Sequence, residues 1–283
     1  MRRALGLLAA ALLLPAPARP AERTGSFRSE SLGRDVAYSV QLPPSYDKSD
    51  AARYPVLYVL NGLFESEAFW HERGLDRILE GLWAEGAVPE LVVVAVDGGN
   101  SFFVNSPSGR YEDLVTRDTL AWAEGALRIR PGRESRALLG VSMGGYAALR
   151  IALSQPELFG AVAAHSAMLL EAIPRPEDGA RRWHMDAFHR VFGDPIDPAL
   201  WASSDPLAWA RRADPARTPR LYFDCGAQDR FGLYAGNTEL HRRLQARGVP
   251  HEFSLQPGDH GYEYVRSVLP RSLAFLGRFL AGR

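Results

Sequence analysis

The sequence predicts one α/β domain with a mostly parallel central sheet and helices on both faces. Five short runs are apolar at nearly every position, at 54–60, 91–97, 136–141, 161–165 and 221–224. Runs of this kind are typical of parallel strands that helices cover on both sides. Helical patterns alternate with these runs, at 67–83, 111–127, 143–154, 232–247 and 262–280. Such alternation predicts a doubly wound sheet in a single domain.

Two departures from this alternation shape the expected domain. Two extended segments, 26–32 and 35–42, precede it and are joined by a turn at Gly33 and Arg34. Residues 168–219 lack an obvious strand and contain helical fragments at 183–192 and 206–212. We therefore expect a small helical insertion at 168–219 over the sheet edge, within one domain that spans residues 22–283.

The composition excludes several classes of protein. The 283 residues carry 33 basic and 33 acidic side chains, so the formal net charge is zero. A general nucleic-acid-binding role would show as a basic excess, and we expect no nucleic-acid partner. Cys225 is the single cysteine, which excludes an intrachain disulfide and a cysteine zinc site. We expect Cys225 to be a buried packing residue.

The first 21 residues have the pattern of a cleavable signal peptide. Arg2 and Arg3 precede an apolar stretch at 4–14, and Ala16-Pro17-Ala18 follows it as a small-residue cleavage pattern. We expect cleavage after Ala18 or Ala21 and a secreted or periplasmic protein. An uncleaved anchor or a disordered leader is the alternative. The apolar stretch of 11 residues is too short to span a bilayer, and no later segment is long and apolar enough, so we expect no stable membrane insertion after cleavage.

One motif predicts chemistry. Gly140-Val141-Ser142-Met143-Gly144 joins the strand pattern at 136–141 to the helical pattern at 143–154. A Gly-x-Ser-x-Gly sequence between a strand and a helix predicts a sharp turn that raises a nucleophilic serine above the carboxyl edge of the sheet. Side chains at Gly140 and Gly144 would collide with neighbouring backbone in such a turn. The Met143 N–H at the helix N-terminus could hold an oxyanion. The alternative is a tight turn with an inert, buried Ser142.

A nucleophilic serine needs a base and an acid that orients the base, and in this architecture they follow in the order acid, then histidine. His260 lies in a turn-rich loop before the last helix, whereas His241 lies in a helical pattern and His251 begins a strand. We therefore predict His260 as the base. Asp229 lies just past the strand that contains Asp224, and we predict Asp229 as the acid. Asp224 is the weaker candidate, and Asp259 is interpreted as a loop residue.

Further candidates follow the other strands at the same sheet edge. Asn61-Gly62-Leu63-Phe64 follows the run at 54–60, and the Leu63 N–H is the predicted second oxyanion donor. Substrate-binding candidates are Phe64, Trp70, Phe103 and His165, with further aromatics such as Phe188 in the insertion. The alternative for the aromatics is core packing, and for His165 it is a structural role at a strand end. The spacing of His184, Asp186 and His189 could suggest a metal site, but a solvated helix face is the favoured interpretation, so we expect no metal and no cofactor.

The sequences GRDV, YVLNGL, GVSMGGYAAL, CGAQD and GDHGYEY resemble the putative-esterase family of α/β-hydrolases over residues 27–280. That family includes S-formylglutathione hydrolases, feruloyl and acetylxylan esterases, siderophore esterases and mycolyltransferases. The resemblance implies an α/β-hydrolase fold and a triad of Ser142, Asp229 and His260. It also implies Leu63 and Met143 as oxyanion donors. Asn61 departs from the pattern, since many members have histidine or aspartate there.

These observations together predict an exported serine carboxylesterase for small to medium acyl esters, including feruloyl or acetyl esters. The expected partner is a small-molecule or polysaccharide-linked ester. An acyltransferase of the mycolyltransferase type would share the same motifs, because an alcohol then replaces water in the second step. A non-catalytic hydrolase fold that only binds ligands is the third alternative. The sequence carries no indication of the oligomeric state.

Overall fold

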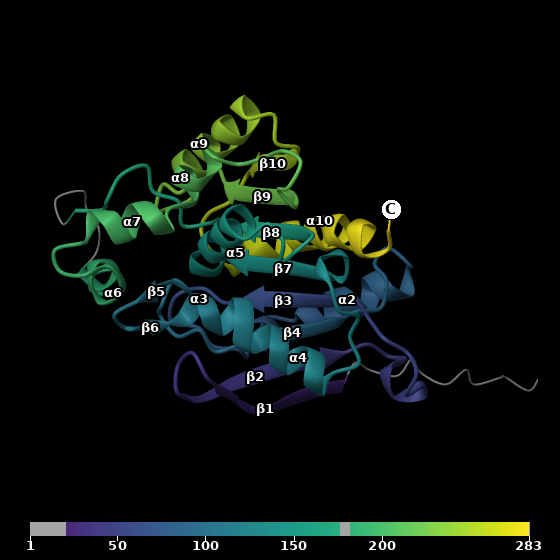
Figure 1. The fold of residues 1–283 in the computed structure, drawn as a ribbon. Helices are drawn as coiled ribbons and strands as arrows, with labels where there is room; N and C mark the ends of the chain where they lie inside the picture. The colour runs from purple at the N-terminus through teal and green to yellow at the C-terminus, as the bar shows by residue number, and fades with distance from the viewer. Residues whose placement is uncertain (1–20, 176–181, 283) are drawn as a thin grey trace, which may run out of the picture.

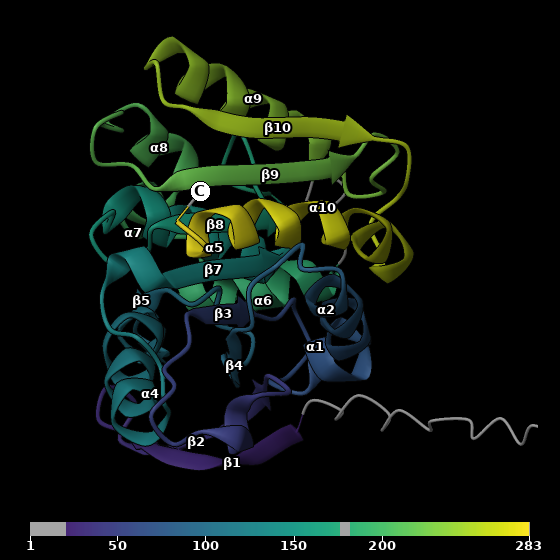
Figure 2. The ribbon, with the colours of Figure 1, turned by 90° about the vertical axis from the view of Figure 1, so that its right-hand side faces the viewer.

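A single eight-stranded sheet runs through the computed structural model, which describes residues 21–175 and 182–282 (Figures 1 and 2). The strand order is β1-β2-β4-β3-β7-β8-β9-β10. Helices cover both faces, which confirms the predicted α/β fold class. Apart from Ala21, the expected signal peptide at 1–21 lies outside the described residues.

The sheet is antiparallel at one edge and parallel elsewhere. β1 (Ala21–Ser29) and β2 (Arg34–Leu42) form a hairpin, and β2 pairs antiparallel with β4 (Val92–Val96). The remaining strands are parallel: β3 (Val56–Leu60), β7 (Arg136–Val141), β8 (Ala161–His165), β9 (Arg220–Gly226) and β10 (His251–Gln256). A separate small ribbon is formed by β5 (Asn105–Ser106) and β6 (Gly109–Arg110).

Two apolar cores lie on opposite faces of the sheet. One face is covered by α1 (Phe69–Glu72), α2 (Leu75–Ala84) and α10 (Tyr262–Leu280). The other face is covered by α3 (Tyr111–Asp113) with the π-helical turn Leu114–Thr119, α4 (Leu120–Ala126), α5 (Met143–Ser154) and α9 (Tyr234–Ala246). Short 3₁₀ turns lie at Tyr46–Lys48 and Arg133–Ser135. β3, β4 and β8 are buried at every position, which explains their continuous apolar sequences.

Two local features differ from, or refine, the expected elements. The predicted helix at 67–83 is divided into α1 and α2, because Gly74 between them adopts a φ of 81°. The described part of 168–219 holds no strand, and it forms α6 (Arg182–Phe192), α7 (Pro198–Ser204) and α8 (Pro206–Ala210). In Figure 1, α6 and α7 lie beyond the carboxyl end of β3, on the side where the loops that follow the parallel strands lie.

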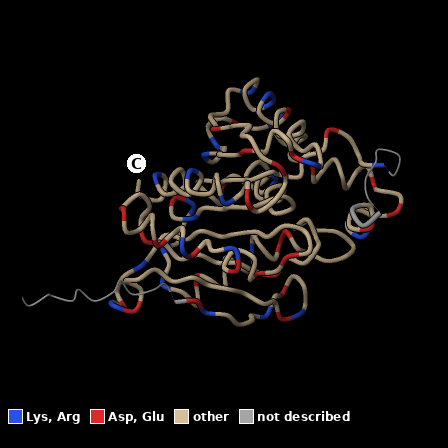
Figure 3. Tube along the Cα trace, turned by 180° about the vertical axis from the view of Figure 1, so that it is seen from behind, with Lys and Arg blue, Asp and Glu red and all other residues tan. Residues whose placement is uncertain are grey.

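Charged residues of both signs are interspersed along the chain when the molecule is seen from behind (Figure 3). Within residues 21–175 and 182–282, no helix combines the length and apolarity needed to cross a membrane.

Candidate active site

Ser142 lies in a strained turn between β7 and α5. Its backbone adopts φ 53° and ψ −113°, a region that non-glycine residues rarely occupy. Three backbone hydrogen bonds hold this conformation. The Ser142 N–H donates to the carbonyl of His165 over 2.9 Å, and the Ser142 carbonyl accepts from the N–H groups of Tyr146 at 2.9 Å and Met168 at 3.0 Å. The serine is therefore fixed to β8 and to the segment that follows it.

Two glycines permit this turn, as the sequence predicts. A Cβ atom on Gly140 would lie 2.1 Å from the carbonyl oxygen of Gly144. A Cβ atom on Gly144 would lie 2.4 Å from the carbonyl oxygen of Leu60, at the end of β3. Both distances are far inside van der Waals contact, so any side chain would push α5 away from the sheet. The glycines thus let the start of α5 sit directly over the carboxyl ends of β3 and β7.

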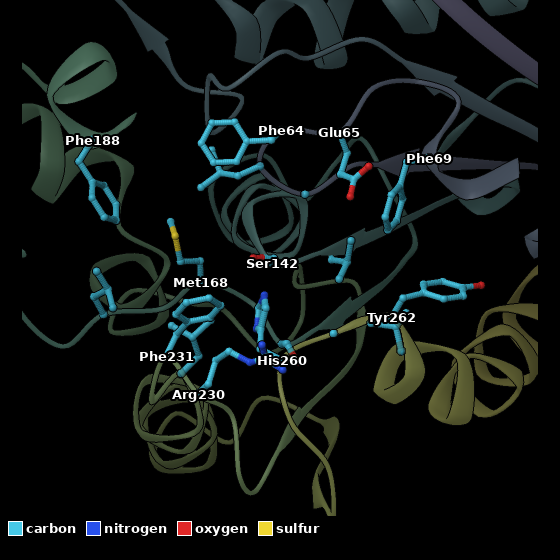
Figure 4. Close-up of a pocket in the computed structure, with 18 of the residues that line it drawn as sticks. Phe64, Glu65, Phe69, Ser142, Met168, Phe188, Arg230, Phe231, His260 and Tyr262 are labelled. Atoms are coloured by element: carbon cyan, nitrogen blue, oxygen red, sulfur yellow. The ribbon is translucent and has the colours of Figure 1, made fainter. Parts of the chain in front are cut away.

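Asp229 and His260 meet at the same edge of the sheet, from two different loops. Asp229 follows β9, and His260 lies between β10 and α10. The His260 Nδ1 is 2.8 Å from the Asp229 Oδ2, and the Asp229 side chain is fully buried. Because the carboxylate accepts, Nδ1 carries the proton, which leaves Nε2 of a neutral ring as the acceptor. Ser142 and His260 line one pocket, and Figure 4 shows the His260 ring beside Ser142.

Hydrogen bonds hold the loop that carries Asp229 against the loop that carries His260. The N–H of Gln228 donates to the Gly258 carbonyl over 2.9 Å, and the N–H of Gly258 donates to the Gln228 side chain over 2.8 Å. The Arg230 guanidinium forms an ion pair with Asp259 and lowers the pKa of that carboxyl to about 2. Asp259 also accepts from the N–H groups of Arg230 and His260. From its sequence position, Asp259 was interpreted only as a loop residue. Its ion pair with Arg230 joins two loops that are distant in sequence, so no local sequence pattern indicates it.

The pocket around Ser142 has a volume of about 780 Å³ and two chemically different sides. In Figure 4, Phe64, Met168, Phe188 and Phe231 lie on one side of Ser142, whereas Glu65, Phe69 and Tyr262 lie on the other. Arg73 also lines the pocket, and its guanidinium lies 3.6 Å from Glu65 and 5.4 Å from the centre of the Tyr262 ring. Arg230 also lines the pocket, beside Phe231 in Figure 4. The first side is thus mostly apolar with one guanidinium at its border, and the other combines aromatic rings with a charged pair.

The predicted oxyanion residues lie beside Ser142. Gly62 and Leu63 line the pocket, and a Cβ atom on Gly62 would lie 3.8 Å from the Ser142 Cβ. Asn61 is buried and shapes this loop, since its side-chain nitrogen donates to the carbonyls of Gly62 and Glu65, each over 2.9 Å. Met143 begins α5, where the first N–H groups of a helix have no acceptor within the helix. The Leu63 and Met143 N–H groups remain predictions as oxyanion donors.

Three of the four substrate-binding candidates do not line the pocket. Trp70, Phe103 and His165 have exposed fractions of 2%, 0% and 0%. The Trp70 indole N–H donates to the Leu60 carbonyl over 3.2 Å, and the Phe103 carbonyl accepts from Arg150 over 2.6 Å. The expectation that these three side chains contact the substrate is corrected: they belong to the packing and hydrogen bonding beneath the site. Phe64 lines the pocket and is 60% exposed.

Several pocket residues were not predicted individually, namely Glu65, Arg73, Met168, Arg230, Phe231 and Tyr262. Glu65 and Met168 lie in the segments that follow β3 and β8, and Arg230, Phe231 and Tyr262 lie within two residues of Asp229 or His260, which was the available signal. Arg73 follows α1 and carried no such signal. Cys225 is buried as expected, with its sulfur 3.6 Å from the Asp229 Oδ2. Burial and the neighbouring Asp229 raise the pKa of the Cys225 thiol, which keeps it protonated.

His241 contacts His251 and the aromatic ring of Phe253, outside the pocket. His241 Nδ1 lies 2.7 Å from His251 Nε2, and the His241 ring stacks on Phe253. Among the described residues, no group of three or more His, Cys, Asp or Glu side chains is arranged to hold a metal ion. The side chain of His184 lies outside the described residues.

The close approach of the Asp229 and His260 loops leads to a testable prediction at Gly226. A Cβ atom there would lie 2.4 Å from the Gly258 carbonyl oxygen, so Gly226→Ala must push the His260 loop away from Asp229. We expect the turnover of an ester substrate to fall by about 100-fold, the loss typical of a misplacement of about 1 Å at a reacting group.

Gly81→Ala is the matched control for this substitution. Gly81 lies within α2, and no atom lies within 4 Å of an added Cβ, so we expect unchanged turnover and a slightly higher stability, by about 1 kcal/mol. Equal turnover in Gly226→Ala and Gly81→Ala would show that the loop contact does not position the site.

Comparisons with known proteins agree with this geometry. The family model described as "Putative esterase" matches residues 29–276. An esterase of Mycobacterium tuberculosis is 26% identical over 258 residues, which cover 83% of this chain and 54% of the relative. The chain therefore spans about half the length of the first curated relatives that it matches.

Two further similarities cover nearly whole chains. An S-formylglutathione hydrolase of Paracoccus denitrificans is 26% identical over 264 residues, covering 86% of this chain and 88% of the relative. A solved ferulic acid esterase superposes with a TM-score of 0.77 at 27% identity, covering 93% of this chain and 99% of that one. The fold is that of the α/β-hydrolases. The chain belongs to the family described as "Putative esterase".

Proposed function

We propose that the protein is a serine carboxylesterase with Ser142 as nucleophile, His260 as base and Asp229 as the acid that orients the base. The observation that carries this proposal is the combination of the strained Ser142 turn and the His260–Asp229 hydrogen bond of 2.8 Å on one pocket. A buried carboxylate that fixes the histidine tautomer is what a serine nucleophile requires.

The reaction proceeds in two acyl-transfer steps. His260 Nε2 takes the Ser142 proton while the serine oxygen attacks the ester carbonyl carbon. The Leu63 and Met143 N–H groups stabilise the negative charge that develops on the carbonyl oxygen. The imidazolium then returns the proton to the leaving alcohol, and the acyl group stays on Ser142. Water deprotonated by His260 attacks this acyl-enzyme and releases the acid, which restores the serine.

The pocket supports an ester with an apolar acyl group and a polar alcohol. The apolar side, with Phe64, Met168, Phe188 and Phe231, suits a small to medium acyl chain or an aryl acyl group. The side with Glu65, Arg73 and Tyr262 suits a polar alcohol, including one carried by a polysaccharide. The similarity to a solved ferulic acid esterase supports feruloyl esters as a substrate class, and the similarity to an acetyl esterase of Caldicellulosiruptor saccharolyticus supports acetyl esters.

Replacement of the nucleophile tests the proposed activity. We expect Ser142→Ala to keep the native circular-dichroism spectrum and to lower kcat for p-nitrophenyl acetate by about 10⁴-fold or more, because the acyl-enzyme cannot form. A fluorophosphonate should label the unaltered protein at Ser142 and leave the variant unlabelled. Full turnover in Ser142→Ala, or labelling at another residue, would refute the assignment.

Acyl-chain preference tests which residue limits the apolar side. Phe188 lines the pocket and stacks on Phe102 with ring centres 5.2 Å apart. We expect Phe188→Ala to raise the ratio of kcat/KM for p-nitrophenyl octanoate to kcat/KM for p-nitrophenyl acetate by about tenfold. The shorter side chain leaves room to bury roughly two to three more methylene groups of the octanoyl chain, and each contributes about 0.8 kcal/mol at most.

Phe192→Ala is the control for this series. Phe192 lies on the same helix and contacts the same Phe102 ring, but it does not line the pocket. We expect this variant to lose stability without a change in the octanoate-to-acetate ratio. An equal shift of the octanoate-to-acetate ratio in both variants would show that loosening of α6, rather than the side chain at the pocket wall, determines the acyl-chain preference.

We propose further that the protein is exported, which rests on the residue pattern at 1–21. Expression of the full chain in a Gram-negative host should yield an active periplasmic protein whose N-terminus, read by peptide sequencing, is Arg19 or Glu22. Leu12→Arg interrupts the apolar stretch and should keep the protein uncleaved in the cytoplasm. A protein that retains Met1 and stays in the cytoplasm in both forms would contradict export.

A further inference from the structure

A second set of hydrogen-bonded polar side chains lies buried beneath the candidate site, and the reaction described above does not use it. The Asp224 Oδ2 is 2.9 Å from the His165 Nδ1, and the Tyr264 hydroxyl donates to the Asp224 Oδ1 over 2.8 Å. The His165 Nε2 is 2.9 Å from the Ser272 hydroxyl. His165, Asp224 and Ser272 are 0% exposed and Tyr264 is 4% exposed. We call these four residues the Asp224 network.

The sheet register explains why these side chains meet. His165 at the end of β8 is paired with Asp224 on β9, and residues paired in this way point to the same face of the sheet. That face is covered by α10, which supplies Tyr264 and Ser272. The neighbouring Cys225 points to the opposite face and contacts Asp229. Asp224 therefore cannot replace Asp229 as partner of His260, although the two carboxylates are close in sequence.

Each oxygen of the Asp224 carboxylate has its own donor. An ionised carboxylate only accepts, so His165 carries a proton on Nδ1, and the Tyr264 hydroxyl donates to the other oxygen. Burial and the adjacent Asp224 raise the pKa of Tyr264, which keeps this hydroxyl protonated. A buried carboxylate is costly unless such donors satisfy it, and an apolar set of similar volume would be at least as stable. Stability alone therefore does not account for the network.

The Asp224 network is joined to the segments that carry all three triad residues. The His165 carbonyl accepts the Ser142 N–H over 2.9 Å, and the Asp224 carbonyl accepts the Ser166 N–H over 2.8 Å. Asp224 lies five residues before Asp229 on the same strand and loop, and Tyr264 lies four residues after His260, in the first turn of α10. The carboxylate thus connects β8, whose His165 carbonyl accepts the Ser142 N–H, to α10, which begins two residues after His260.

We propose that Asp224 is a positioning residue, which through His165 and Tyr264 holds Ser142 and His260 at their working separation. This proposal rests on the proposed esterase function. The four side chains take no part in the chemistry themselves, because they are enclosed by β8, β9 and α10 and do not line the pocket.

Tyr264→Phe is the most selective test, because it removes one hydrogen bond and keeps the ring. We expect kcat for p-nitrophenyl acetate to fall by between about tenfold and about 100-fold, with KM changed by less than about twofold. The second-order rate constant for fluorophosphonate labelling of Ser142 should fall by the same factor, since both reactions need His260 in place. A residue that only stabilised the fold would alter neither rate at a temperature well below unfolding.

Tyr58→Phe is the matched control for the loss of a buried hydroxyl. Tyr58 lies on β3 with 1% exposure, and its hydroxyl makes no hydrogen bond within the part of the chain that the structure describes. We expect this variant to keep the kcat and the labelling rate of the unaltered protein. If Tyr264→Phe has the same kcat and the same labelling rate as Tyr58→Phe, the proposal is overturned.

Asp224→Asn supplies a second, independent measurement. An amide offers one acceptor and one donor side, so either Tyr264 or His165 must face an N–H group. We expect a loss of kcat at least as large as in Tyr264→Phe, and we expect the double variant to be little worse than Asp224→Asn alone, because both act through one network. Independent, multiplying losses would contradict a shared network. Should Asp224→Asn fail to fold, the comparison of Tyr264→Phe with Tyr58→Phe still tests the positioning role of Asp224.

Absence of turnover in the unaltered protein would instead refute the proposed esterase function.

Discussion

The strained backbone of Ser142 is the constraint on which the rest of the site depends. A non-glycine residue at φ 53° and ψ −113° costs about 1–3 kcal/mol and persists only when its surroundings fix it. Here Gly140 and Gly144 remove the side chains that would collide, and the carbonyl of His165 accepts the serine N–H. The strain is offset by the buried cores on both faces of the sheet. In return, the serine oxygen and the start of α5 reach the same pocket.

The position of His260 depends on contacts between segments that are distant in sequence. Asp229 and His260 are 31 positions apart, and β9, α9 and β10 separate or flank their loops. Gly226 and Gly258 allow the loops to approach, and the exposed Arg230–Asp259 pair links their tips. Exposed ion pairs contribute little to stability, so we interpret this pair as an aid to loop geometry. Beneath it, the Asp224 network connects the same loops to β8.

Sequence patterns predict this fold well, because continuous apolar runs and an alternation of strands and helices leave few other arrangements. They also predict Ser142, Asp229 and His260 as candidates, because each follows a strand at one edge of a parallel sheet. Prediction fails for Trp70, Phe103 and His165, which follow or end strands at that edge but point into the core. Trp70 lies in α1 and Phe103 lies in the loop between β4 and β5, where the sequence does not specify the direction of a side chain. For His165, at the end of β8, a one-residue change of position reverses the face, and sequence spacing alone does not specify which face α10 covers. The Asp224 network was missed for the same reason, since only the register of β8 and β9 brings His165 and Asp224 together.

Isolation of the acyl-enzyme tests the central claim most directly. The unaltered protein, quenched in acid during turnover of p-nitrophenyl butyrate, should gain the mass of one butyryl group in place of a hydrogen. Peptide mass spectrometry should find that group on the oxygen of Ser142, and an Asp229→Asn variant should form the adduct far more slowly. A butyryl group on another side chain, or steady turnover with no acyl adduct under conditions in which deacylation limits the rate, would contradict the account.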